Sequence, residues 1–249
     1  MIRLAQAFFR KFGPVSTQAA EPFNPAILCK QSRSDFYPLA GKRIFDLTAS
    51  AFGLMFLSPL FFVIGMLLKM TSPGPTFFLQ ERVGRGGQLF RIAKFRSMVV
   101  NAENVGPALT FAGDPRVIQL GRILRRLKLD ELPQLWNVLM GEMSLVGPRP
   151  ELPRYVAGFT SQQRQVLTVR PGITDLASIV YRQEEDLLGR NPDPEQFYRQ
   201  VVLPHKLSLN MEYLQRMSFV FDLSLIFQTT ISLLCPLRVT KLCKWGGGQ

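Results

Sequence analysis

Asp130 and Glu131 are adjacent carboxylates at the junction of a basic segment and an apolar one. Pro133 follows at a position typical of the first turn of a helix, so the pair lies near a helix start. Neighbouring helical side chains diverge by about 100°, and the two carboxylates are therefore free to take different roles. One could attack phosphorus while the other holds a metal ion. The plainer interpretation is that the pair caps the helix and favours its dipole.

Cations elsewhere in the chain indicate that a phosphate is the target. A carboxylate attacks phosphorus when the charge of the phosphate is neutralised, and Mg²⁺ does so with one or two carboxylates and the oxygens of the substrate. Arg125 and Arg149 can offer forked donors to phosphate oxygens. Lys94 and Arg96 can contact phosphate or a membrane surface, or they can be ordinary surface cations. The residues alone leave these alternatives open.

The composition indicates an anionic partner and a lipid environment. The chain has 249 residues and a formal net charge of +12, yet 47% of its residues are hydrophobic and 20 are Phe. Positive charge attracts phosphates, anionic lipids or nucleic acid, whereas this apolar content is typical of a chain partly embedded in a membrane. The sequence has no aromatic-basic platform motif for nucleic acid. Its three cysteines lack zinc-site spacing, which fits a reduced cytoplasmic setting.

Residues 47–68 form the longest uncharged apolar stretch, which as a helix would span about 33 Å. Cations stand at both of its ends, so the positive-inside rule gives no direction of crossing. Ser58-Pro59 removes a backbone donor in the middle of the stretch and favours a bend. We therefore predict a re-entrant helix over 41–71, bent at Ser58-Pro59, that enters and leaves on one face of the membrane. A straight span and a buried core helix are the alternatives.

The other segments predict a mainly α fold with a few short strands. Residues 72–98 combine turn residues with short apolar runs, which favours loops and short strands or helical turns. Residues 120–127 place leucine and isoleucine on one helical face and arginine on the other, so we expect a basic amphipathic helix. Residues 219–235 are too short and too interrupted for a simple crossing, and an in-plane or core-packing helix is predicted.

Seven motifs in order along the chain resemble the bacterial sugar transferase family, the monotopic polyprenyl-phosphate phosphoglycosyl transferases. The matching motifs are KRIFD at 42–46, SPGP at 72–75, QERVG at 80–84, KFRSM at 94–98, LDELPQLWNV at 129–138, MSLVGPRPE at 143–151 and RPGIT at 170–174. Each motif alone is weak, but together they extend over about three quarters of the chain. The resemblance is therefore specific.

The resemblance implies an undecaprenyl-phosphate sugar-1-phosphate transferase that works through a covalent intermediate. Asp130 matches the nucleophile that attacks the sugar-bearing phosphate of a UDP-sugar and releases UMP, and Glu131 matches the carboxylate that binds Mg²⁺. A polyprenyl phosphate, the acceptor, would then take the phosphosugar. The implied division is a basic leader (1–40), the re-entrant helix (41–71) and a catalytic domain (72–249). That domain would lie at the cytoplasmic face of the bacterial inner membrane and carry amphipathic helices.

Two residues depart from the family pattern. Ala93 stands where the family commonly has Tyr, and Asp175 stands where it often has Gly. Arg170 is expected to position a loop, and His205 receives no role. The competing interpretation is a basic scaffold that binds membrane lipids without catalysis. The sequence leaves open which UDP-sugar is used, which polysaccharide pathway is served, which residues contact uridine and whether a homo-oligomer forms.

Overall fold

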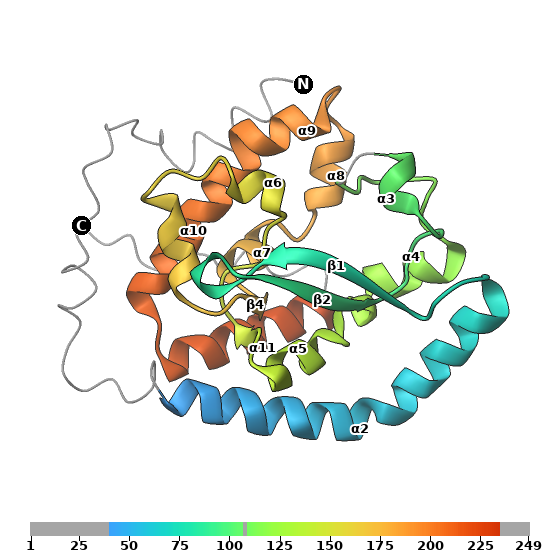
Figure 1. Ribbon diagram of the computed structural model, residues 1–249, viewed down its shortest axis with the longest axis horizontal. Coiled ribbons are helices and arrows are strands. Elements are labelled where there is room, and N and C mark those ends of the chain that lie inside the picture. The colour runs from blue at the N-terminus through green and yellow to red at the C-terminus, as the bar shows by residue number, and fades with distance from the viewer. Residues whose placement is uncertain (1–39, 107–108, 235–249) are drawn as a thin grey trace. The chain divides into compact units, whose positions relative to one another are not determined.

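The computed structural model describes residues 40–106 and 109–234 (Figure 1). The expected leader at 1–40 lies outside these residues except for Ala40, as do residues 235–249 and all three cysteines. Helices predominate in the described part and the strands are few and short, which confirms the prediction of a mainly α fold with a few short strands. The elements in chain order are α2 (Lys42–Thr71), β1 (Phe77–Val83), η3 (Arg85–Gly87), β2 (Leu89–Phe95), α3 (Ala102–Val105), α4 (Gln119–Arg126), η4 (Leu129–Glu131), α5 (Gln134–Met140), β3 (Ser144–Val146), α6 (Pro153–Val156), η5 (Gln163–Thr168), β4 (Gly172–Thr174), α7 (Leu176–Val180), α8 (Glu184–Gly189), α9 (Pro194–Phe197), η6 (Tyr198–Val202), α10 (Leu203–Arg216) and α11 (Phe219–Leu234).

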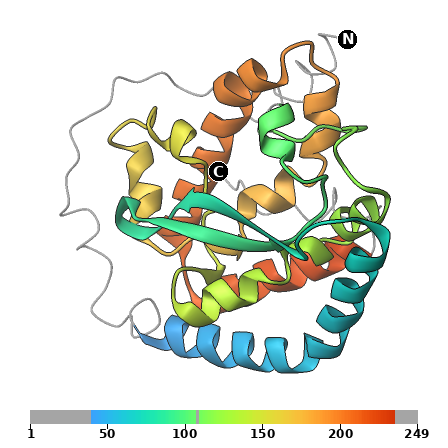
Figure 2. The same ribbon diagram turned by 45° about the vertical axis from the view of Figure 1, so that its right-hand side comes forward.

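The long helix α2 is continuous through Pro59, although proline cannot donate a hydrogen bond to the carbonyl of Met55. The hydroxyl of Ser58 donates to that carbonyl at 2.8 Å, so the carbonyl keeps a partner. Figures 1 and 2 show that α2 changes direction part-way along its length. The helix is long and apolar enough to cross a membrane. Most of its large apolar side chains are exposed, which argues against the alternative of a buried core helix.

The KRIFD motif attaches the first turns of α2 to the rest of the domain. Lys42 forms an ion pair with Asp222 of α11. Arg43 donates to the carbonyl of Val138 near the end of α5 at 2.6 Å. Asp46 accepts a hydrogen bond from the backbone of Leu145 in β3 at 3.0 Å. Three separate elements are therefore joined to one end of the apolar helix by charged or polar side chains.

The segment after α2 forms an antiparallel hairpin, so of the predicted loops, short strands or helical turns its two main elements are short strands. β1 pairs with β2 so that Phe77 faces Phe95 and Val83 faces Leu89. Gly86 and Gly87 in the connecting turn have φ angles of 68° and 80°, which favour glycine. Figures 1 and 2 show the hairpin running across the domain, with its open end toward the second half of α2. The hairpin brings the KFRSM motif back toward the centre of the domain.

Two three-residue strands, β3 and β4, pair two of the remaining motifs with each other. β3 and β4 are parallel, with Ser144 opposite Gly172 and Val146 opposite Thr174. A Cβ atom added to Gly172 would lie 2.1 Å from the backbone nitrogen of Gly147, so only glycine permits this close approach. The parallel pairing therefore fixes MSLVGPRPE beside RPGIT.

The helix predicted over 120–127 forms as α4, and its leucine and isoleucine side chains are only partly covered. Leu124 is buried in the core, whereas Ile123 and Leu127 are exposed next to exposed arginines. The predicted C-terminal helix forms α11, where Leu225 is buried and Phe227 is exposed. Both helices thus contribute to the core on one side and present apolar side chains on another.

Candidate active site

Asp130 and Glu131 lie in a short 3₁₀ turn between α4 and α5. Lys128, immediately before the turn, has a left-handed backbone conformation (φ 56°), and Pro133 stands immediately before α5. This sharp change of direction gives the two carboxylates different surroundings, although both are buried, at 5% and 7% exposure. The predicted helix start is confirmed, with the pair just ahead of the helix.

Glu131 is held by two cations that come from different motifs. Lys94 of β2 donates to Glu131 Oε1 at 3.1 Å. Arg149, after β3, donates to Oε2 at 3.2 Å and also to Oε1. Burial alone would raise the pKa of Glu131, but the charges of Arg149 and Lys94 outweigh burial and hold the pKa well below its usual value. Glu131 is therefore a stable anion.

Asp130 has a contrasting environment. Its Oδ1 is buried and has no hydrogen-bond partner within the described residues. Burial, followed by the negative charge of Glu131, raises the pKa of Asp130 above its ordinary value. A carboxylate with an uncommitted oxygen and raised basicity is suited to nucleophilic attack, whereas a carboxylate held by two cations is suited to binding a cation.

Lys94 also has a perturbed pKa. Burial lowers the pKa of its ammonium group to about 8, and the charge of Glu131 opposes that shift. The ammonium group therefore depends on an anionic partner to remain charged. Any phosphate that reaches Glu131 would offer it such a partner.

The backbone around Arg149 is held by hydrogen bonds to the side chains of Asp175 and Arg82. Asp175 Oδ2 accepts from the backbone nitrogen of Arg149 at 3.3 Å, while its Oδ1 caps α7 by accepting from Ser178 N at 2.7 Å. Arg82 donates to the carbonyl of Pro150 at 3.0 Å. Asp175, a departure from the family pattern, is thus a positioning residue that sequence reasoning missed. Its signal was an Asp immediately before a short apolar helix.

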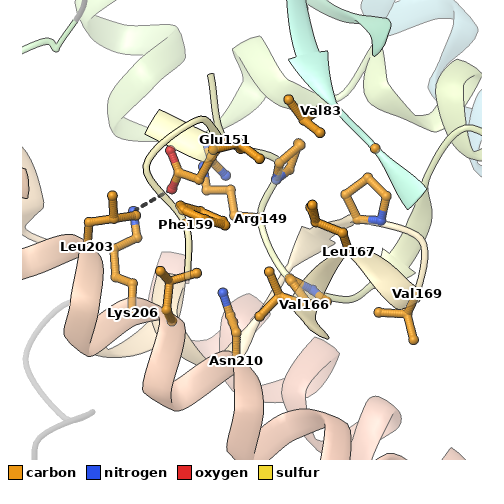
Figure 3. A pocket seen from close by; sticks show the side chains of 16 residues that line it. Val83, Arg149, Glu151, Phe159, Val166, Leu167, Val169, Leu203, Lys206 and Asn210 are labelled. Atoms are coloured by element: carbon orange, nitrogen blue, oxygen red, sulfur yellow. Dashed lines mark ion pairs between the residues drawn. The ribbon is translucent and has the colours of Figure 1, made fainter. Parts of the chain in front are cut away.

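Glu151, two residues after Arg149, is held by side chains of η6 and α10. Tyr198 donates to Glu151 Oε1 at 2.8 Å, and Lys206 of α10 lies 3.8 Å from the same oxygen. Figure 3 shows Lys206 and Glu151 directed toward each other beside Arg149. The segment that presents Arg149 is therefore held along its whole length.

A small pocket borders this segment (Figure 3). Its walls are mostly apolar and include Val83, Phe159 and Val166, with Lys206 and Asn210 contributed by α10. Neither Asp130 nor Glu131 is among its lining residues. We therefore regard it as part of the support behind Arg149 and not as the place of reaction.

Asn137 sets the relation between α5 and β2, and sequence reasoning also missed it. Its side-chain oxygen accepts from Ala93 N at 2.9 Å, and its amide nitrogen donates to Arg91 O at 2.8 Å. Lys94 follows Ala93 directly, so these bonds fix the register that places Lys94 beside Glu131. The available signal was an asparagine within the apolar stretch LWNVL.

The structure gives the other two predicted phosphate contacts different partners. Arg125 pairs with Glu185 of α8 and lies 3.4 Å from the hydroxyl of Ser97. Arg96 donates to the carbonyls of Ser72 and Pro73, which form the turn after α2. The structure therefore brings Lys94 and Arg149 together with the carboxylates, while the contacts of Arg125 and Arg96 are to other segments.

The donor set fits Mg²⁺ only if a substrate completes it. Within residues 40–106 and 109–234, no group of three or more His, Cys, Asp or Glu side chains gathers to hold a metal ion. Glu131, with or without Asp130, would be the protein's contribution. One or two carboxylates completed by phosphate oxygens and water is a common Mg²⁺ environment.

Comparison with known proteins agrees with these motifs. The family model of the bacterial sugar transferases matches residues 37–236. The chain is 37% identical over 198 residues to the UDP-N-acetylgalactosamine-undecaprenyl-phosphate N-acetylgalactosaminephosphotransferase of Aeromonas hydrophila, covering 78% of this chain and 43% of that protein. It is 39% identical over 219 residues to the undecaprenyl-phosphate glucose phosphotransferase of Komagataeibacter xylinus, covering 84% and 38%.

A shorter relative matches almost end to end. The exopolysaccharide production protein PSS of Rhizobium leguminosarum bv. phaseoli is 36% identical over 198 residues, covering 77% of this chain and 94% of that protein. The chain thus spans less than half of the first two relatives and nearly all of the third. Because the family model extends over most of the sequence and a relative is matched over nearly its full length, the chain belongs to the bacterial sugar transferase family.

Proposed function

We propose that this protein transfers a sugar phosphate from a UDP-sugar to undecaprenyl phosphate and releases UMP. The observation that carries the proposal is the contrast between the two carboxylates. Asp130 has a buried oxygen without a partner, and Glu131 beside it is paired with Lys94 and Arg149. Two relatives are named as undecaprenyl-phosphate sugar phosphotransferases, which supports this choice of substrates.

In the first step, an oxygen of Asp130 attacks the phosphorus that carries the sugar. A bond forms between that oxygen and phosphorus, and the bond from phosphorus to the bridging oxygen breaks. UMP leaves with the electron pair. Lys94 and Arg149 stabilise the negative charge that develops on the phosphate oxygens, because both are charged donors in a site with little water.

In the second step, a phosphate oxygen of the lipid carrier attacks the same phosphorus. The acyl phosphate bond to Asp130 breaks, the carboxylate is regenerated, and the product is the lipid diphosphate sugar. The carboxylate of Asp130 in the first step and the lipid phosphate in the second both attack through an ionised oxygen. Neither step therefore requires a general base. Mg²⁺, when bound to Glu131 and the diphosphate, would neutralise charge on the donor.

The exposed apolar side chains support a site at a membrane surface. α2 exposes Phe56 (74%) and Phe62 (73%), and α5, the helix that follows the carboxylates, exposes Trp136 and Met140. We infer that these faces, with the exposed residues of α4 and α11, contact lipid. α2 would enter and leave on the cytoplasmic face of the inner membrane, so that a dissolved donor and a lipid acceptor reach the same carboxylate in turn.

UMP release from a panel of UDP-sugars, with undecaprenyl phosphate and Mg²⁺, tests the proposal. Wild-type protein should release UMP with at least one sugar, and Asp130→Asn should reduce the rate by three orders of magnitude or more, since the amide is not a nucleophile toward phosphorus. Asp186→Asn, which changes an exposed Asp of α8, is the matched control and should keep the rate. Equal, negligible release by wild type and Asp130→Asn would favour a non-catalytic membrane scaffold.

A further inference from the structure

Both oxygens of Glu131 are already occupied by cations of the protein. Lys94 and Arg149 share Oε1, and Arg149 also binds Oε2. The Glu131 side chain is only 10% exposed, so little water screens these charges. The carboxylate proposed to hold the metal ion is therefore paired when no substrate is present.

A divalent cation arriving alone would meet strong opposition. It would have to share or displace two fixed positive charges at a buried site, and like charges repel strongly where the dielectric constant is low. The protein offers few compensating ligands, since no group of three metal-binding side chains exists in the described part of the chain. Asp130 is the nearest additional carboxylate.

A diphosphate removes this electrostatic repulsion between the metal ion and the two cations of the protein. Each phosphate of a nucleotide sugar carries a negative charge, so a metal ion bound to the diphosphate adds almost no net charge to the site. The phosphate oxygens can also accept from Lys94 and Arg149, which would free Glu131 for the metal ion. The site keeps the same charge before and after binding only when the two ligands enter together.

We propose that Lys94 and Arg149 are the counter-ions of Glu131 in the free protein and transfer to the donor diphosphate on binding, so that metal ion and nucleotide each bind more tightly when the other is present. This inference rests on the proposed function, because it takes the donor to be a nucleoside diphosphate sugar. Binding linkage requires the effect to be reciprocal: nucleotide raises the affinity for the metal ion by the same factor as the metal ion raises the affinity for nucleotide.

Lys94→Met has a distinctive expected signature. Removal of one cation from Glu131 should strengthen metal binding to the protein without nucleotide, because less repulsion opposes it. The same substitution should weaken nucleotide binding without metal, because a phosphate partner is lost. A merely structural defect would weaken both, so opposite changes identify the exchange of partners. Lys69→Met, which alters an exposed lysine at the end of α2, is the matched control.

The experiment titrates Mn²⁺ into the full chain in detergent micelles and follows the loss of the free-ion signal by electron paramagnetic resonance, with and without UDP, after subtraction of the Mn²⁺ that UDP binds without protein. The affinity for UDP without metal is measured separately by equilibrium dialysis. UDP should raise the Mn²⁺ affinity of wild type at least ten-fold. Lys94→Met should bind Mn²⁺ alone at least ten-fold more tightly than wild type, and Lys69→Met should match wild type.

Two outcomes would overturn the inference in different ways. Equal Mn²⁺ affinity with and without UDP, in protein that releases UMP from a UDP-sugar, rejects the paired binding and leaves the proposed function standing. Failure of UDP to bind under any condition, together with no UMP release, rejects both. A Lys94→Met protein that is folded by circular dichroism but loses affinity for Mn²⁺ and UDP alike assigns Lys94 a structural role instead.

Discussion

Asp130 and Glu131 share a chemical type and a 3₁₀ turn, but their partners separate them. The two cations on Glu131 favour its ionised form, while burial and the neighbouring charge make Asp130 harder to ionise. Pairs of carboxylates whose environments push their pKa values apart are a recurrent way to divide roles in an active site. The division of work proposed here follows from contacts that arise only in the folded chain.

The pH dependence of UMP release should report on Lys94. Its pKa of about 8 means that its charge, and with it a phosphate contact, is lost as the pH rises through that value. We expect kcat/KM to fall above about pH 8 in wild type, and Lys94→Arg, which stays charged, to move this fall to higher pH. An identical basic limb in both proteins would contradict the assignment.

Unfolding of the chain at high pH would not explain the fall in kcat/KM. Burial lowers the pKa of Lys94 in the folded chain below its unfolded value, so between the two values the unfolded chain binds more protons. The contribution of Lys94 to the free energy of unfolding therefore rises with pH in this window, and falls back as the pH drops. A melting temperature measured across the same pH range separates the two effects.

Asp175 offers a test of positioning. Asp175→Ala removes a helix cap, which costs about 0.5–2 kcal/mol, and also releases the backbone of Arg149. Asp193→Ala removes an equivalent cap from α9, where Asp193 Oδ1 accepts from Gln196 N at 3.0 Å, but touches no site residue. Asp175→Ala should lose at least as much stability as Asp193→Ala, because Asp175 is fully buried and Asp193 is exposed. Only Asp175→Ala should slow UMP release, by roughly ten- to a hundred-fold. Equal rates in the two variants would remove Asp175 from the site's support.

Residue types and order predict part of this site. The carboxylate pair, Lys94 and Arg149 could be selected because phosphate chemistry needs such groups. The partners of Arg125 and Arg96 could not, since Glu185 and the carbonyls after α2 reach them only through the tertiary fold. The same is true of Asp175, whose second hydrogen bond crosses between two motif loops.

At the scale of elements, the Ser58-Pro59 pair combines two opposite effects in α2. Proline removes a helical donor, and the preceding hydroxyl satisfies the carbonyl that loses it. The helix can therefore change direction without leaving the carbonyl of Met55 unpaired in lipid. This arrangement explains why the segment remains one helix despite its internal proline.

Pro59→Ala restores the missing donor and should favour a straight crossing. The measurement places single cysteines at Gly41 and Ser72, in a background with the native cysteines replaced by serine, and labels them with a membrane-impermeant reagent. Both positions should label from one side in wild type and from opposite sides in Pro59→Ala. Phe56→Ala changes an exposed neighbour without altering the backbone and should behave as wild type. Same-side labelling of Pro59→Ala would show that the proline is not the main cause of the bend.

Sequence periodicity predicts the longer elements better than the short ones. The apolar run of α2 is a strong local signal and predicts a helix there, whereas the short apolar runs of the hairpin left short strands and helical turns open. The three-residue strands β3 and β4 carry no such signal, because their pairing depends on the close approach of Gly147 and Gly172. The partial exposure of α4 likewise depends on what packs beside it.

For the molecule as a whole, apolar surface and positive charge suggest two ways to bind a membrane. Exposed charge is screened by salt, whereas burial of apolar side chains in lipid is not. A wash at high ionic strength should therefore leave the wild-type chain in the membrane fraction, and detergent should release it. Release by salt alone would favour a peripheral scaffold held by charge, and would contradict an embedded α2.

The proposed two-step mechanism depends on a covalent link between Asp130 and a phosphorylated sugar. The most direct measurement is mass spectrometry of the intact chain and its peptides after incubation with UDP-sugar and Mg²⁺ without the lipid acceptor. The account predicts one added phosphosugar on the peptide containing Asp130, its loss when undecaprenyl phosphate is supplied, and no adduct in Asp130→Asn. An adduct on another residue, or acceptor-dependent UMP release with no adduct at all, would contradict it.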